Sequence, residues 1–94
     1  MLIRLVKMHF APAFVAEFKE TFKTVQPRIA SFKGCSAVQL LQDNADPNVF
    51  FTISHWADEQ HLEDYRQSLL FRETWAVVKP NFQSKAEAWS LLSP

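Results

Sequence analysis

The 94-residue sequence predicts a single α+β domain over residues 1–94, with a ferredoxin-like β-α-β-β-α-β order and one antiparallel sheet. Branched and aromatic residues fill four segments in the manner of strands, and apolar residues at helical spacing fill the segments between them. The aromatic content is high, with nine Phe, three Trp and one Tyr. No stretch has the composition of a linker, so one domain accounts for the chain.

The first half of the chain predicts a strand followed by a helix. Residues 1–10 are rich in branched and apolar side chains and are expected to form the first strand. Apolar spacing becomes helical over residues 12–22 and continues to Phe32, although Pro27 is expected to kink or restart this helix. Gly34 is the only glycine, so we expect it to end the helix with a backbone angle that other residues resist.

The middle of the chain predicts a pair of strands joined by a turn. Residues 35–42 and 49–56 are expected to be the second and third strands, and the latter is the most strand-like segment of the sequence. Residues 43–48 contain Asp-Pro and predict the turn between them. Two strands joined by so short a connection are expected to pair antiparallel.

The last third predicts a helix and a final strand. Asp58 can cap the helix, and apolar residues at nearly helical spacing follow it, with a break expected near Ser68. Pro80 is expected to end the helix. Residues 84–92 alternate small and large side chains and predict the fourth strand, which places both helices on one side of the sheet.

Both faces of this sheet are predicted to be apolar. An antiparallel sheet with helices on one face normally carries polar residues on the other. Here one parity of the first and third strands holds Ile3, Leu5, Val49, Phe51 and Ile53, and the other holds Leu2, Val6, Met8, Phe10, Phe50 and Trp56. Because the helices cover one face only, we expect the other to pair with a second copy and form a homodimer.

Composition excludes several functional classes. The ten Lys and Arg balance the ten Asp and Glu, which is unlike a nucleic-acid-binding protein. Apolar runs are too short to cross a bilayer, and the N-terminal pattern is unlike a signal peptide, so no membrane association is expected. The single Cys35 cannot form an internal disulfide and fits a cytoplasmic location. It is expected to be a buried apolar residue rather than a reactive thiol.

Aromatic and hydroxyl-bearing residues predict a pocket for a flat, largely apolar small molecule. Alternate residues of the third strand share one face, and the second helical segment is expected to lie near it. No standard catalytic motif occurs, and the three histidines have no metal-binding spacing, so no metal site is expected. The alternative is that these aromatic residues only fill the core. The candidate pocket residues are Phe50, Thr52, Ser54, Trp56, Tyr65, Arg66, Phe71, Arg72 and Trp75.

The spacing of Trp56, Leu62, Tyr65, Ser68 and Phe71 resembles the signature of antibiotic biosynthesis monooxygenase domains. The Gly-Cys turn at residues 34–35 and the Asp-Pro-Asn turn before the third strand are similar to that family as well, so the resemblance covers nearly the whole chain. It implies a dimeric α+β barrel, in which two ferredoxin-like sheets pack face to face.

The resemblance also implies a range of activities. Members oxidise aromatic polyketides or quinols with molecular oxygen and without metal or flavin, while others degrade haem, isomerise small ketones or have no known activity. Trp56 matches the family's pocket Trp, but Tyr65 stands where many members have His, Thr52 where polyketide oxidisers have Asn, and Ser54 where many have Glu. Trp75 stands at the axial His position of haem-degrading members, which argues against haem degradation.

Two functional hypotheses follow. The first is a cofactor-independent monooxygenase, an oxidoreductase acting on a small aromatic or quinol-like substrate. In it Trp56 and Trp75 wall the pocket, Tyr65 and Thr52 orient or deprotonate a substrate hydroxyl, and Arg66 or Arg72 stabilises the phenolate. It requires a cavity that touches Trp56, Tyr65 and Trp75. The alternative is a non-catalytic dimeric domain that binds a hydrophobic small molecule.

Overall fold

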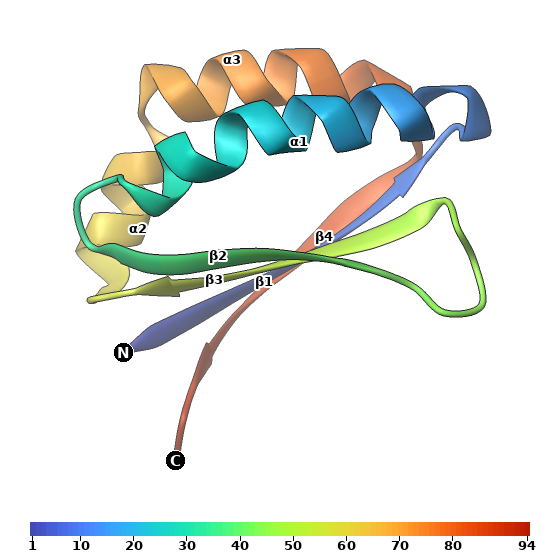
Figure 1. Cartoon of the computed structure of the whole chain (residues 1–94). Helices are drawn as coiled ribbons and strands as arrows, with labels where there is room; N and C mark the ends of the chain where they lie inside the picture. Colours follow the sequence, from blue (N-terminus) through green and yellow to red (C-terminus); the bar gives the residue numbers. More distant parts are fainter.

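The computed structural model describes all 94 residues as a four-stranded antiparallel sheet with the helices on one face (Figure 1). The strand order is β2-β3-β1-β4, which confirms the predicted ferredoxin-like arrangement. Helices α1 and α3 lie side by side above the sheet, and α2 lies at the end near the N-terminus (Figure 1). The elements in chain order are β1 (Leu2–Phe10), η1 (Pro12–Phe14), α1 (Val15–Ala30), β2 (Cys35–Gln42), β3 (Val49–Trp56), α2 (Glu59–Arg66), α3 (Leu69–Val78), η2 (Lys79–Asn81) and β4 (Phe82–Leu92).

Side-chain caps set the boundaries of α2 and α3. The Asp58 carboxylate accepts a hydrogen bond from the backbone N–H of His61 at 2.9 Å and begins α2. The Ser68 hydroxyl accepts one from the backbone N–H of Phe71 at 3.2 Å and begins α3. The break predicted near Ser68 is therefore confirmed, and its cause is a second helix N-terminus.

Two features around α1 depart from or refine the expectation. The restart predicted at Pro27 is wrong, because α1 runs through Pro27 and ends at Ala30; the alternative of a kink there stays a prediction. Pro27 lies in the last turn and cannot donate the backbone hydrogen bond to the turn before it, but the buried apolar stripe of α1 holds the helix in place. Gly34 has the expected positive φ of 89°, and a Cβ atom there would overlap the His61 side chain.

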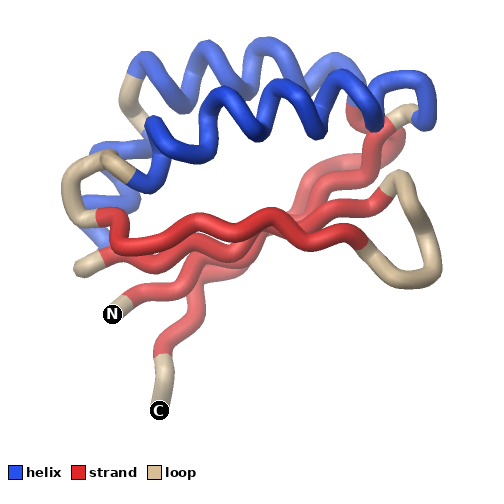
Figure 2. The backbone as a smooth tube through the Cα atoms, viewed as in Figure 1, coloured by secondary structure: helices blue, strands red, loops and turns tan.

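The strand register sorts side chains onto two faces, because directly opposed residues point the same way. Arg4 pairs with Ser54, and Val6 pairs with Thr52, on the face under the helices. Leu5 pairs with Ile53 on the opposite face, which no element of the chain covers (Figure 2). We call these the covered face and the open face. The final strand starts at Phe82 rather than at residue 84, because Phe10 extends its pairing with β1.

The layer between the sheet and the helices is packed most tightly at its two ends. At one end the Phe10 and Phe18 rings lie 4.3 Å apart, and the Phe18 and Phe50 rings 5.1 Å apart, between centroids. At the other end Trp56 stacks on Tyr65 with 5.0 Å between centroids. Phe10, Phe50 and Trp56 have the most deeply buried large side chains of the molecule. No helix in the structure is both long enough and apolar enough to span a membrane.

Candidate functional site

A cavity of about 770 Å³ lies between the covered face and the helices. The residues on the covered face beneath it are smaller than the aromatic residues at the two ends of the layer: Val6, Thr52, Ser54 and Ala86 line the cavity. Small side chains at these positions leave volume that large ones would fill. Residues 84–88 of β4 all line the cavity, and successive strand residues point to opposite faces, so the cavity extends to the sheet edge at β4.

Four aromatic side chains form one wall of the cavity. Tyr65 meets Phe71 edge to face with 5.3 Å between centroids, and Phe71 lies 5.4 Å from Trp75. Trp75 meets Phe82 edge to face at 5.5 Å, which carries the wall from α2 through α3 to the start of β4. We call these four residues the aromatic wall. A continuous aromatic surface of this kind suits a flat ring system, which stacks on ring faces or meets ring edges.

Ten of the 25 residues that line the cavity are polar or charged, and most of them lie on the strands. Thr52 supplies a hydroxyl from the middle of β3, and Tyr65 supplies a phenol from α2. Two guanidinium groups, those of Arg4 and Arg66, also line the cavity. Arg66 Nη1 lies 3.2 Å from Glu63 Oε2 in an ion pair on α2. An apolar cavity with a few such groups is the usual form of a small-molecule site.

Ser54 is the one buried polar side chain of the protein. Its hydroxyl accepts a hydrogen bond from the indole Nε1–H of Trp56 at 2.9 Å. This bond satisfies a buried donor that would otherwise destabilise the fold. Ser54 therefore lies at the cavity surface, and Trp56 lies behind it, where its ring supports Tyr65 from the far side.

The phenol of Tyr65 is protonated at neutral pH. Burial, and to a smaller extent the charge of Cys35, raises the pKa of Tyr65 to about 12. A low-dielectric site disfavours the charged phenolate, which accounts for the direction of the shift. In the cavity Tyr65 is therefore a hydrogen-bond donor and not a base.

The structure brings most of the predicted pocket residues together. Five of the predicted residues line the cavity besides Ser54: Thr52, Tyr65, Arg66, Phe71 and Trp75. Phe50 and Trp56 do not line it; they are fully buried at opposite ends of the layer. Arg72 lies exposed on α3, outside the lining. The cavity thus touches Tyr65 and Trp75 but not Trp56, so the contact with all three residues that the monooxygenase hypothesis required is not met. Trp56 does not wall the cavity, because its side chain is fully buried behind Ser54 and Tyr65.

Sequence reasoning missed Arg4 and Phe82. Arg4 occupies the covered parity of β1, among Leu2, Val6 and Met8, where a charged residue is out of pattern. That departure was the available signal, because a charge on a buried strand face needs a partner or a function. Phe82 lies just before the predicted start of the last strand, so the prediction did not place it on the sheet or in the pocket.

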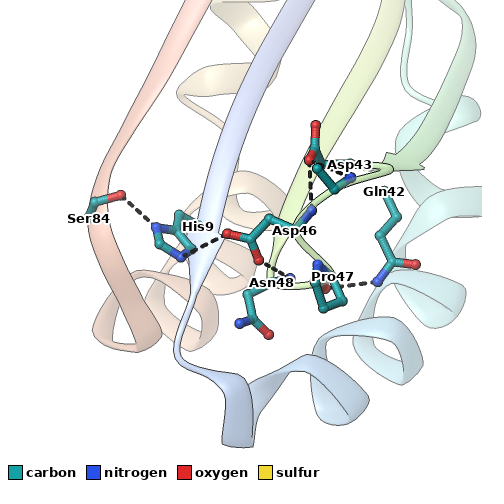
Figure 3. A network of polar contacts seen from close by, with 8 residues as sticks. His9, Gln42, Asp43, Asp46, Pro47, Asn48 and Ser84 are labelled. Atoms are coloured by element: carbon teal, nitrogen blue, oxygen red, sulfur yellow. Dashed lines mark hydrogen bonds and ion pairs between the residues drawn. The ribbon is translucent and has the colours of Figure 1, made fainter.

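The histidines lie away from the centre of the cavity and do not form a metal site. His9 lies between Ser84 and Asp46, with its Nδ1 3.2 Å from Ser84 Oγ and its Nε2 3.9 Å from Asp46 Oδ2 (Figure 3). The second distance is an ion-pair contact and too long for a hydrogen bond, so this group lacks the geometry of a Ser-His-Asp triad. His61 contacts Asp58, 2.7 Å from Nδ1 to Oδ1. No group of three or more His, Cys, Asp or Glu side chains is placed to hold a metal ion.

Comparisons with solved structures show the same fold in proteins of low sequence identity. A crystal structure described as an antibiotic biosynthesis monooxygenase has a TM-score of 0.93 at 16% identity, covering 100% of this chain and 99% of its own. A conserved protein from Methanosarcina mazei Go1 has a TM-score of 0.89 at 23% identity, covering 97% and 91%. A putative antibiotic biosynthesis monooxygenase from Caulobacter crescentus CB15 has a TM-score of 0.88 at 20% identity, covering 96% and 86%.

Sequence comparison identifies the family. A search of curated proteins finds no match to this sequence. The family model for antibiotic biosynthesis monooxygenase matches residues 1–77, which include the first three strands, α1, α2, all but the last residue of α3 and most of the aromatic wall. The resemblance carried by Trp56, Leu62, Tyr65, Ser68 and Phe71 is thereby confirmed. The chain belongs to the antibiotic biosynthesis monooxygenase family.

Proposed function

We propose that the protein is a cofactor-independent monooxygenase that oxidises a small aromatic or quinol-like substrate in the cavity of the covered face. The observation that carries the proposal is a cavity of about 770 Å³ that combines the aromatic wall with the Thr52 and Tyr65 hydroxyls and the Arg66 guanidinium. A volume of this size accommodates a small fused-ring molecule. Family membership supports oxidation as the type of reaction.

The proposed reaction is written for a hydroxyanthrone, whose ring methylene becomes a carbonyl. Loss of one proton gives an electron-rich anion, which transfers one electron to O₂. The resulting radicals join through a new C–O bond, the peroxide anion takes up a proton from water, and the hydroperoxide then loses water. One oxygen atom ends in the carbonyl group and the other in water, so the two C–H bonds of the methylene and the four-electron reduction of O₂ balance without metal or flavin.

Each polar residue has a defined part in this proposal. Tyr65 donates a hydrogen bond to a substrate oxygen, because it is protonated at neutral pH. Thr52 orients the ring from the floor of the cavity. Arg66 stabilises the substrate anion, and a hydrogen bond to a charged group contributes about 1.5–3 kcal/mol. This interaction lowers the pKa of the substrate hydroxyl. The released proton passes to water at the edge of the cavity beside β4.

Oxygen uptake with simple quinols and a hydroxyanthrone tests the proposal, and the chain offers a matched pair of substitutions. Thr52→Val removes a hydroxyl inside the cavity, whereas Thr24→Val removes one on the exposed side of α1. We expect Thr52→Val and Tyr65→Phe to lower kcat/KM about tenfold or more, since each deletes a hydrogen bond to substrate. Thr24→Val is expected to retain the wild-type rate. Equal rates for all four proteins would contradict the proposal.

A non-catalytic ligand-binding domain is the second candidate. It is favoured by the lining itself, in which Glu87 is the only carboxylate and no histidine occurs. Such a lining offers no side-chain base poised near neutral pH. The two candidates differ in one outcome: a binding domain takes up the same aromatic compounds without consuming oxygen.

We further propose that two copies pair through the open face. Its apolar residues include Leu41, Trp89 and Leu91, which are 40%, 40% and 46% exposed. Burying four aromatic or branched side chains per subunit corresponds to on the order of 10 kcal/mol before the cost of association. The dimeric barrel implied by the family resemblance has the same geometry. The cytoplasmic location expected from the single Cys35 also stays a prediction.

A further inference from the structure

The charge of the cavity differs from the charge of the chain. The whole protein has a formal net charge of zero. The residues that line the cavity nevertheless include four cations, Arg4, Arg66, Lys79 and Lys85, and one acidic residue, Glu87, a net charge of +3. Glu87 pairs with Lys7 on the parity of the open face, so it does not neutralise the covered-face cations from within the cavity. A positively charged cavity with apolar walls attracts anions, because low-dielectric surroundings strengthen the field inside it.

Arg4 is the only one of these four cations that is partly buried rather than exposed. It projects from the covered face of β1, between Ser54 and Ser90 on the neighbouring strands. Its Nη1 donates a hydrogen bond to Ser90 Oγ at 3.0 Å, and no carboxylate lies within ion-pair distance. Arg66 by contrast pairs with Glu63. The Arg4 guanidinium thus keeps most of its five N–H donors for a ligand.

The surroundings of Arg4 disfavour an unliganded charge. Burial lowers the pKa of Arg4, the charge of Arg66 lowers it further, and Glu63 acts in the opposite direction. The guanidinium nonetheless stays charged, since its ordinary pKa lies far above neutrality. An anion placed against Arg4 would offset the cost of burying its charge and would weaken the repulsion from Arg66. The position of Arg4 therefore favours binding of an anion.

We propose that Arg4 anchors a carboxylate of an aromatic substrate, whose ring lies against the aromatic wall. This inference rests on the proposed function for the reaction but adds the substrate class: an aromatic carboxylic acid rather than a neutral phenol or quinol. A planar guanidinium matches a carboxylate through two parallel N–H···O bonds. Arg66 remains beside Glu63 and near the reacting oxygen.

The test compares 2-naphthoate with its neutral isostere 2-naphthamide, with binding measured by calorimetry. We expect wild-type protein to bind naphthoate about tenfold or more tightly than naphthamide, as a charge-assisted hydrogen bond predicts. Arg4→Met is expected to remove this preference, and Arg4→Lys to retain part of it, because Lys supplies a point charge without the paired donors. Arg28→Met, which removes an exposed guanidinium on α1, is the matched control and should bind as wild type does.

Naphthamide affinity serves as the folding control, since it should be the same for wild type and Arg4→Met. Equal affinity of wild type for the two compounds, no binding of either at millimolar concentration, or a preference that survives Arg4→Met would each overturn the inference. Oxygen uptake separates it from the proposed function. Turnover of neutral hydroxyanthrones that is insensitive to Arg4→Met would leave the monooxygenase intact and remove the carboxylate anchor. A preference for naphthoate without turnover of any substrate would support the carboxylate anchor and contradict the monooxygenase proposal.

Discussion

The two faces of the sheet are built from the same strands but differ in side-chain size. On β3 the covered face carries Thr52 and Ser54, and the open face carries Phe51 and Ile53 next to them in sequence. On β4 the covered Ala88 precedes the open-face Trp89. In the middle of these strands the face under the helices leaves a cavity, whereas the face without any cover carries large apolar residues. The large side chains of the covered face, Phe10, Phe50 and Trp56, lie at its two ends. The difference fits the two proposals, that the covered face binds a small molecule and that the open face pairs with a second copy.

The largest expected effect is on the open face. Leu91→Arg places a charge among apolar residues that the proposed dimer buries. Because both copies carry the change, we expect it to weaken association about a hundredfold or more, the value of two buried leucines. Leu69→Arg is the matched control, because Leu69 is an exposed leucine on α3, 69% exposed and away from the sheet. Light scattering at micromolar concentration measures both.

The outcome that would contradict the dimer is simple to recognise. A monomeric mass for the wild-type protein at micromolar concentration would rule out pairing through the open face. A dimer that is weakened equally by Leu91→Arg and Leu69→Arg would place the interface elsewhere.

The smaller effect is on the covered face and concerns alkaline pH. Tyr65 has a pKa of about 12 in the folded protein, against about 10 for an unperturbed tyrosine. The pKa is raised on folding, so the stabilisation is complete below pH 10 and is lost as pH rises from about 10 to about 12. Two pKa units correspond to a loss of at most about 2–3 kcal/mol in the free energy of unfolding.

Because the chain has one tyrosine, its ultraviolet titration reports Tyr65 alone. We expect a midpoint well above 10 in the folded protein and near 10 in urea. Urea unfolding of Tyr65→Phe is the control, since it should lose the part of the alkaline destabilisation that belongs to this phenol. A folded-state midpoint near 10 would show that Tyr65 is solvated, and the cavity would then lack its buried donor.

The fold was largely predictable, because each element carries its own local signal. Strand alternation, the cap at Asp58 and the single Gly34 place most boundaries within about two residues, and the break at Ser68 follows from hydroxyl capping. The prediction of a restart at Pro27 was wrong because it considered only the tendency of proline to end a helix. It left out the burial of the apolar stripe of α1, which stabilises the helix. That burial depends on residues far away in the sequence, and no local pattern encodes it.

The candidate site was predictable only in part. Parity places Thr52 and Ser54 on one face, but it cannot separate residues that border a cavity from those behind them, such as Trp56 and Phe50. The distinction depends on how completely the ends of the layer pack, which is a property of the assembled structure. Arg4 could have been predicted as a site residue, because it is a charged residue on the otherwise apolar covered face of the first strand.

The central claim is that the cavity of the covered face is the place where an aromatic substrate reacts with O₂. The most direct measurement supplies ¹⁸O₂ to the purified protein with a hydroxyanthrone and follows oxygen consumption together with the mass of the product. The account predicts one ¹⁸O atom in the product carbonyl for each O₂ consumed, at a rate that Tyr65→Phe lowers. No oxygen uptake, or uptake that Tyr65→Phe leaves unchanged, would contradict it.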